Sequence, residues 1–81
     1  MQIKPLRLDL EMKVKKLGLS GKFAKARSFF ENDPRHPSLH TELLGPKQLK
    51  IYSFRIDRKY RAQFIIVNGV AEITEISLHF Q

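Results

Sequence analysis

Cysteine is absent from this chain, and acidic residues are scarce, with Asp+Glu 8 against Lys+Arg 15. Without cysteine the chain can form no disulfide, no thiolate metal site and no cysteine nucleophile, which fits a reducing cytoplasm. The excess of basic residues gives a formal net charge of +7 and a sequence pI of about 10.1. A charge balance of this kind indicates a polyanionic partner.

Long apolar runs are also missing from the sequence. No stretch approaches the roughly 18 residues of a membrane span, and residues 1–5 lack the apolar core of a secretory signal. We therefore expect a soluble, unprocessed, cytoplasmic protein with no membrane partner. With 81 residues, the chain is predicted to form one domain, residues 1–81, with a thin stability margin because small domains bury little surface.

The first half of the chain is predicted to be mainly helical, with one ambiguous segment. Apolar residues alternate over residues 6–14, which is the period of a half-buried strand, but they also include a helical stripe. Both interpretations remain open from the pattern alone. We predict a short strand over residues 2–7 and then a helix from Asp9, as its N-cap, to Leu17, with Gly18 following the C-cap.

A second helix is predicted to begin at Ser20, whose hydroxyl can cap the first backbone N–H groups. Its apolar stripe consists of Phe23, Ala26 and Phe30. Residues 33–34, Asp-Pro, end this helix because proline disfavours helical backbone for the residue before it. The basic residues of the two helices form either solvated outer faces or a surface that attracts RNA.

Residues 35–50 have the composition of a connection, with prolines and a glycine at intervals. Its leucines are expected to pack on the core, namely Leu39, Leu43 and Leu44. His36 and His40 also lie in this segment and are interpreted as loop histidines. Neither has a second histidine or a carboxylate at a zinc-ligand spacing, so the sequence predicts no metal site and no cofactor.

The second half is predicted to form an antiparallel meander. Apolar and polar residues alternate over residues 51–56 and again over residues 60–67, with a turn at residues 57–59 between them. Asn68–Gly69 between β-forming residues predicts a type I′ hairpin turn, which requires positive φ at both central positions. A third strand then runs from Val70 towards Leu78.

The two-residue period assigns the side chains of these strands to two faces. One apolar set is expected to lie against the helices: Tyr52, Phe54, Ile56, Ala62, Phe64, Ile66, Ile76 and Leu78. The opposite face then carries Arg55, Arg61, Gln63, Ser77 and His79. A bulge within residues 73–76, where apolar residues stand three apart, would shift this register. The predicted fold class is α+β, with two N-terminal helices packed on a small twisted antiparallel sheet in the order β-α-α-β-β-β.

The polar face has the side chains that metal-independent cleavage of RNA requires. Such cleavage needs a base for the 2′-hydroxyl, positive groups around the developing phosphorane charge, and an acid for the leaving 5′-oxygen. His79 is the candidate acid or base, Arg61 the first candidate for the phosphate and Arg55 the second. Candidates for contacts with flanking phosphates and bases are Lys47, Lys50, Arg58, Lys59 and Phe80. A solvated surface, or a docking surface for an acidic peptide, is the alternative interpretation.

Three segments of the chain share an order and spacing that resemble a known group of proteins. They are HPSL at residues 36–39 after a helix, YSFRIDRKYR at residues 52–61, and ISLHF at residues 76–80. Together they resemble the RelE/ParE superfamily of bacterial and archaeal toxins from type II toxin–antitoxin systems. The resemblance implies two helices on a twisted antiparallel sheet, and a cognate antitoxin whose acidic, partly disordered segment covers the toxin.

In the nuclease branch of that superfamily, the resemblance implies cleavage of mRNA, free or on the ribosome, by attack of the 2′-hydroxyl. Arg61 matches the arginine of the central strand, and His79 with Phe80 matches the histidine-aromatic pair of the last strand. Phe80 stands where close relatives usually have tyrosine, so it can stack but cannot donate a proton. Some members supply a glutamate as base, but Glu42 does not align with it, and the base remains unassigned. The alternatives are a non-catalytic, ParE-like inhibitor of DNA gyrase and an inactive antitoxin-binding relic.

Overall fold

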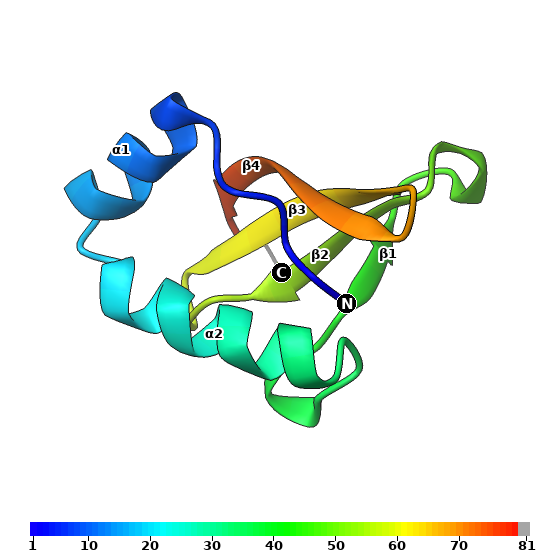
Figure 1. Ribbon diagram of the computed structural model, residues 1–81, viewed down its shortest axis with the longest axis horizontal. Coiled ribbons are helices and arrows are strands. Elements are labelled where there is room, and N and C mark those ends of the chain that lie inside the picture. The colour runs from blue at the N-terminus through cyan, green and yellow to red at the C-terminus, as the bar shows by residue number, and fades with distance from the viewer. Residues whose placement is uncertain (80–81) are drawn as a thin grey trace.

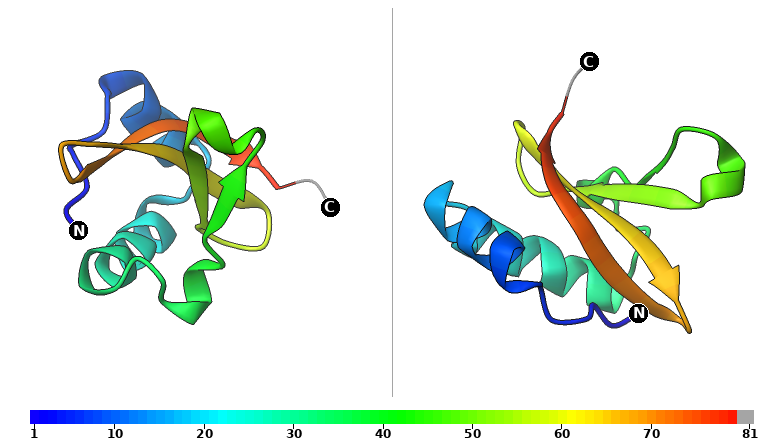
Figure 2. Two further views of the ribbon diagram at one scale, coloured as in Figure 1. Left: turned by 90° about the vertical axis from the view of Figure 1, so that its right-hand side faces the viewer. Right: turned by 90° about the horizontal axis from the view of Figure 1, so that it is seen from above.

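The computed structural model describes residues 1–79 and has an α+β architecture, in which two helices lie on one side of a four-stranded antiparallel sheet (Figure 1 and Figure 2). The helices are α1 (Leu8–Lys16) and α2 (Ser20–Asn32), and none in the described part of the chain is long and apolar enough to cross a bilayer. The strands pair in chain order as β1 (Glu42–Leu44), β2 (Ile51–Arg55), β3 (Tyr60–Val67) and β4 (Val70–Leu78). Two short 3₁₀ helices flank β1, at Pro37–Leu39 and Lys47–Leu49.

The predicted strand over residues 2–7 is wrong. Ile3 forms a single parallel bridge with Ala71 of β4, and the chain enters α1 soon afterwards. Pro5 has no N–H group and therefore cannot continue the pairing. The side chain of Ile3 is nevertheless buried in the core, so the N-terminal segment is anchored to the sheet by packing and one bridge.

The end of α1 is formed as predicted, around a glycine. Gly18 has a φ of 70°, and its N–H donates to the carbonyl of Lys15 at 3.0 Å. The N–H of Leu19 donates to the carbonyl of Val14 at 2.9 Å. This pair of bonds is a Schellman motif, which satisfies the last carbonyls of the helix and turns the chain into α2.

Both predicted N-caps are wrong by one or two positions. The N-cap of α1 is Arg7, and Asp9 lies in the first turn, where its carboxylate accepts from Nε of Arg7 at 3.1 Å. The N-cap of α2 is Leu19, and Ser20 is the first helical residue. Asp9 still stabilises its helix, because a negative charge in the first turn interacts favourably with the helix dipole.

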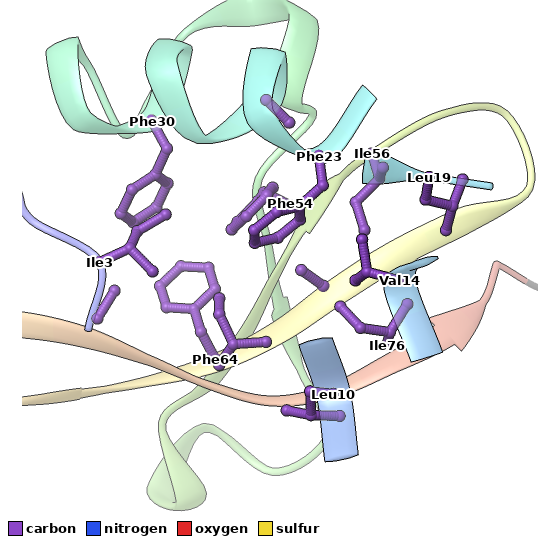
Figure 3. Close-up of a cluster of buried hydrophobic side chains, with 14 of the residues drawn as sticks. Ile3, Leu10, Val14, Leu19, Phe23, Phe30, Phe54, Ile56, Phe64 and Ile76 are labelled. Atoms are coloured by element: carbon purple, nitrogen blue, oxygen red, sulfur yellow. The ribbon is translucent and has the colours of Figure 1, made fainter. Parts of the chain in front are cut away.

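The core fills the space between the inner faces of the helices and the sheet (Figure 3). The predicted stripe of Phe23, Ala26 and Phe30 on α2 is confirmed as buried. The ring centroid of Phe30 lies 5.2 Å from that of Phe54 on β2 and 5.1 Å from that of Phe64 on β3. This aromatic cluster connects α2 to the two central strands.

The helices do not cover the ends of the sheet. Ile66 and Leu78 were expected in the core, but each is 44% exposed, so that expectation is wrong. Ile66 lies next to the β3–β4 turn, and Leu78 is the last residue of β4. Both residues therefore lie beyond the part of the sheet that the helices cover.

Strand β1 lies within the segment that the sequence indicated to be a connection. Glu42–Leu44 pairs with β2, with Glu42 opposite Ser53. Of the leucines expected to anchor this segment, Leu39 is buried, Leu44 is half-buried and Leu43 is exposed. The strand was missed because a run of three residues has too little alternation to be recognised.

The register between β3 and β4 shifts at Thr74, which has no partner on β3. Because of this bulge, Ile73 and Ile76 both lie in the core although they are three residues apart. Ser77 is then opposite Arg61. The predicted bulge is thus located at one residue, and the end of β4 keeps the predicted facing.

The β3–β4 turn gives a first testable prediction. Asn68 and Gly69 have φ values of 53° and 77°, as the predicted type I′ turn requires. Gly69→Ala is expected to lower the free energy of unfolding by about 1–2 kcal/mol, because a Cβ is unfavourable at this φ.

A Cβ would meet no atom within 4 Å at Gly69 or at Gly21 of α2, so Gly21→Ala is a matched control. It is expected to stabilise by up to about 1 kcal/mol. Urea denaturation of both variants measures the difference, and equal signs would contradict the backbone argument.

Candidate active site

The face of the sheet opposite the helices carries a hollow of about 450 Å³. Its walls come from both edges of the sheet, because His40 and Glu42 lie before and on β1, whereas His79 follows β4. The strong twist of the sheet, visible in Figure 2, accounts for this concave shape. The volume falls within the range of about 300–1,000 Å³ that is usual for ligand sites.

Every residue that lines this hollow carries a charged or titratable side chain. The set comprises three arginines, two carboxylates and two imidazoles: Arg55, Arg58, Arg61, Glu42, Asp57, His40 and His79. The three residues predicted to be catalytic, His79, Arg61 and Arg55, therefore lie in one site. Such a lining is typical of a site that binds an anion and exchanges protons with it.

Arg61 is held firmly in the middle of the sheet and is only 5% exposed. Its Nε donates to Oγ of Ser53 at 2.9 Å, and its Nη2 donates to the carbonyl of Ser53 at 3.2 Å. Nη2 also donates to the carbonyl of His40. Nη1 has no partner among residues 1–79, so it is the part of the guanidinium that remains to bind an anion in the hollow.

The charge of Arg61 is partly desolvated. Burial lowers the pKa of the Arg61 guanidinium, while the carboxylate of Glu42 raises it and the neighbouring Arg55 lowers it. Arginine nevertheless remains protonated at neutral pH in proteins. A buried positive charge beside a second one attracts an incoming anion more strongly than a fully solvated charge does.

Arg55 lies directly opposite Arg61, because the two residues are partners in the β2–β3 register. Its Nε donates to the carbonyl of Asp57 at 3.2 Å, which directs the side chain towards the turn after β2. Like charges opposite each other destabilise a sheet. An anion between these guanidinium groups would offset that repulsion.

His79 is half-buried at the end of β4, not sealed in the core. Its backbone N–H donates to the carbonyl of Lys59 at 2.8 Å, which ties the end of β4 to the turn before β3. The main chain of Lys59 therefore positions His79. The side chain of Lys59, one of the predicted contact residues, does not line the hollow.

The remaining predicted contact residues lie in different places. Arg58 lines the hollow, whereas Lys47 and Lys50 belong to the 3₁₀ segment at the opposite end of β2 and do not. Both lysines are exposed. Phe80, predicted to stack on a base, lies outside the described residues.

Asp57 is a lining carboxylate that already has a structural role. Its Oδ1 accepts from the backbone N–H of Lys59 at 2.8 Å and of Tyr60 at 2.7 Å, and Oδ2 accepts from Nζ of Lys22 at 3.4 Å. Burial opposes ionisation, but these hydrogen bonds outweigh it and lower the pKa of Asp57. This carboxylate is therefore a poor proton acceptor.

Sequence reasoning missed His40, Glu42 and Asp57 as members of the site. His40 and Glu42 were assigned to a connection, and their position in the site depends on the pairing of β1 with β2. The Gly45–Pro46 turn signal between two β-type segments could have indicated that pairing. No group of three or more His, Cys, Asp or Glu residues within residues 1–79 could hold a metal ion.

Comparison with known proteins does not assign the chain to a family. No protein-family model and no curated protein sequence matches it.

Proposed function

We propose that this chain is the toxin of a type II toxin–antitoxin system and acts as a metal-independent endoribonuclease on mRNA, free or on the ribosome. A RelE-like relationship of its fold is part of the same proposal. The observation that carries it is that His79 and the opposed pair Arg55 and Arg61 line one hollow on the open face of the sheet. An imidazole beside paired guanidinium groups is suited to proton transfer on a phosphodiester.

In this mechanism the hollow binds the phosphate that is to be cleaved. Arg55 and Nη1 of Arg61 contact its non-bridging oxygens and stabilise the charge that develops on them. A base removes the proton of the 2′-hydroxyl, the 2′-oxygen attacks phosphorus, and the bond to the 5′-oxygen breaks. His79 donates a proton to that leaving oxygen. The products are a 2′,3′-cyclic phosphate and a free 5′-hydroxyl, without oxidation or reduction.

The same surface supports the proposed partners. With a formal net charge of +7, the chain attracts RNA and an acidic antitoxin segment alike. A disordered acidic peptide that folds over the hollow would neutralise its arginines and exclude the phosphate. Binding of the antitoxin is therefore expected to compete with binding of RNA.

Substitution of the substrate tests this function directly. The purified protein is given an mRNA fragment, free or bound to ribosomes, and a matched fragment with 2′-deoxyribose at the mapped cleavage position. We expect cleavage of the first and a rate at least about 100-fold lower for the second, because the nucleophile is missing. Primer extension locates the cut, and mass spectrometry identifies the cyclic phosphate. Equal cleavage of both fragments would exclude attack by the 2′-hydroxyl.

A non-catalytic role, as a gyrase inhibitor or as an antitoxin-binding relic, is favoured by one observation. Arg61 uses Nε and Nη2 to connect β2, at Ser53, with the segment before β1, at His40, and a domain without activity would use them in the same way. A supercoiling assay with DNA gyrase separates these roles. Inhibition of supercoiling with no RNA cleaved would replace the nuclease by a gyrase inhibitor, and neither effect would leave only antitoxin binding.

A further inference from the structure

We infer that His40 is the general base of the proposed reaction and that it removes the proton of the 2′-hydroxyl while His79 protonates the leaving group. This inference rests on the proposed function and assigns the role that the sequence left unassigned. It starts from the presence of a second imidazole in the same hollow as His79. The two side chains come from opposite edges of the sheet, so a bound phosphodiester can lie between them.

The backbone of His40 is held on several sides. It has a left-handed conformation, with a φ of 44°, at the end of the Pro37–Leu39 helix. Leu39 before it is buried in the core, and Oγ1 of Thr41 after it donates to the carbonyl of Pro34 at 2.8 Å. The carbonyl of His40 accepts from Arg61. The imidazole thus extends from a fixed point, which general-base catalysis requires.

The ring of His40 is available for proton transfer, whereas the ring of His36 is not. Nδ1 of His36 accepts from the backbone N–H of Ser38 at 3.1 Å, and its ring stacks on Phe29 with centroids 4.2 Å apart. The side chain of His40 makes no hydrogen bond to residues 1–79, and the residue is exposed. It stands on the rim between the arginine-lined hollow and a neighbouring one beside Tyr52.

The carboxylates of the hollow are weaker candidates for this role. Asp57 is occupied by the turn after β2, as described above. Glu42 already interacts with the buried guanidinium of Arg61 and raises the pKa of that group. Imidazole, by contrast, generally exchanges protons near neutral pH, at which general-base catalysis is most efficient. The other charged groups that face the hollow are Arg55 and Arg58.

The protons that His40 and His79 accept and donate balance over one turnover. Neutral His40 accepts the 2′-hydroxyl proton as the bond from the 2′-oxygen to phosphorus forms. Protonated His79 gives its proton to the 5′-oxygen as the bond from phosphorus to that oxygen breaks. Both residues return to their starting states by exchange with water. Because one ring must be neutral and the other protonated, the rate of cleavage is expected to fall at both low and high pH.

The test uses His40→Asn, with His36→Asn as its matched control. Asparagine tolerates left-handed backbone, which keeps the loop conformation at residue 40, and at residue 36 it can still accept from Ser38. We expect His40→Asn to lower the cleavage rate by about 10²- to 10⁴-fold, with an unchanged melting temperature and unchanged RNA binding at low salt. His36→Asn is expected to cleave at the rate of the natural protein.

A modified substrate then distinguishes the base from the acid. An mRNA fragment with sulfur in place of the bridging 5′-oxygen at the cleavage position has a leaving group that needs no protonation. This fragment is expected to restore most of the rate to His79→Ala and none of it to His40→Asn. The acidic limb of the pH–rate profile should be absent in His40→Asn, and the alkaline limb should be absent in His79→Ala.

The outcomes separate the inference from the proposal on which it rests. If the natural protein cleaves no RNA, free or ribosome-bound, the proposed function fails and the inference with it. If the natural protein cleaves and folded His40→Asn keeps its rate and acidic limb, only the inference is overturned. Loss of that limb in Glu42→Gln, with His40→Asn unaffected, would assign the base to Glu42.

Discussion

Replacing His79 with alanine is expected to lower the rate of RNA cleavage by about 10²- to 10⁴-fold, which is the usual contribution of a general acid or base. The side chain is half-buried at the end of β4 and belongs to no part of the core. The hydrogen bond that positions this residue comes from its backbone N–H, which alanine retains. The melting temperature is therefore expected to change little.

Ser77→Ala is the control for this variant, because Ser77 lies on the same face of β4 but outside the arginine-lined hollow. It should cleave at nearly the natural rate. Cleavage is measured by gel electrophoresis of a labelled mRNA fragment over a series of pH values. If His79→Ala cleaves at the natural rate over that series, this residue takes no part in proton transfer.

Replacing Arg61 with alanine is expected to impair both folding and cleavage. The change leaves the hydroxyl and carbonyl of Ser53 and the carbonyl of His40 without their donor. Unsatisfied buried polar groups cost about 1–3 kcal/mol, a large fraction of the stability of so small a domain. Loss of one donor to the developing charge lowers cleavage by about 10²- to 10³-fold.

Two further variants separate these contributions of Arg61. Arg61→Lys keeps the charge, but an ammonium cannot replace the planar fork that reaches all three acceptors. The Arg61→Lys variant is therefore expected to retain most of its affinity for RNA but to have a lower free energy of unfolding. Ser53→Ala keeps the guanidinium and removes one buried acceptor, so it should lower the free energy of unfolding by about 1 kcal/mol and leave most of the cleavage. Urea denaturation and cleavage assays are made on the same preparations. An alanine variant at residue 61 that is as stable as the natural protein would show that these bonds contribute nothing.

Local signals predicted the parts of the fold that depend on neighbouring residues. The glycine that ends α1, the stripe of α2 and the Asn68–Gly69 turn each follow from a backbone conformation or a period. The strand predicted at residues 2–7 failed because its alternation continued into α1, and a pattern of Leu and Met serves both structures. Helix positions relative to the sheet, which decide that Ile66 is exposed, are a tertiary property that no local pattern records.

The sequence predicted part of the site, because the alternation of side chains along a strand is also a local signal. Parity along β2, β3 and β4 was sufficient to bring Arg55, Arg61 and His79 to one face, and the structure places them in one hollow. The alternation along the strands could not indicate that Arg61 is buried. The segment that lies over Arg61 includes His40, whose carbonyl accepts from the guanidinium. That segment is positioned by the pairing of β1, a strand of only three residues, with β2. The alternation also could not separate the two loop histidines. Their difference lies in a stacking contact with Phe29 and a hydrogen bond to Ser38.

The bulge at Thr74 decides which side chain of β4 reaches the hollow. With continuous pairing from Ile73 onward, each later residue would be turned to the other side of the sheet, which would bury the carboxylate of Glu75 and direct the imidazole of His79 towards the helices. Thr74 is instead the extra, unpaired residue of β4. Its carbonyl accepts from Nη2 of Arg7 at 3.4 Å. Its hydroxyl donates to the carbonyl of Gln63 at 3.3 Å. If Thr74 were deleted, Glu75 could still pair with Gln63 and Ile76 with Ala62, so the later side chains would keep their faces. One more inserted residue with continuous pairing would turn those side chains to the other face. Which side chains after Thr74 face the hollow thus depends on this single unpaired position, not on the length of β4.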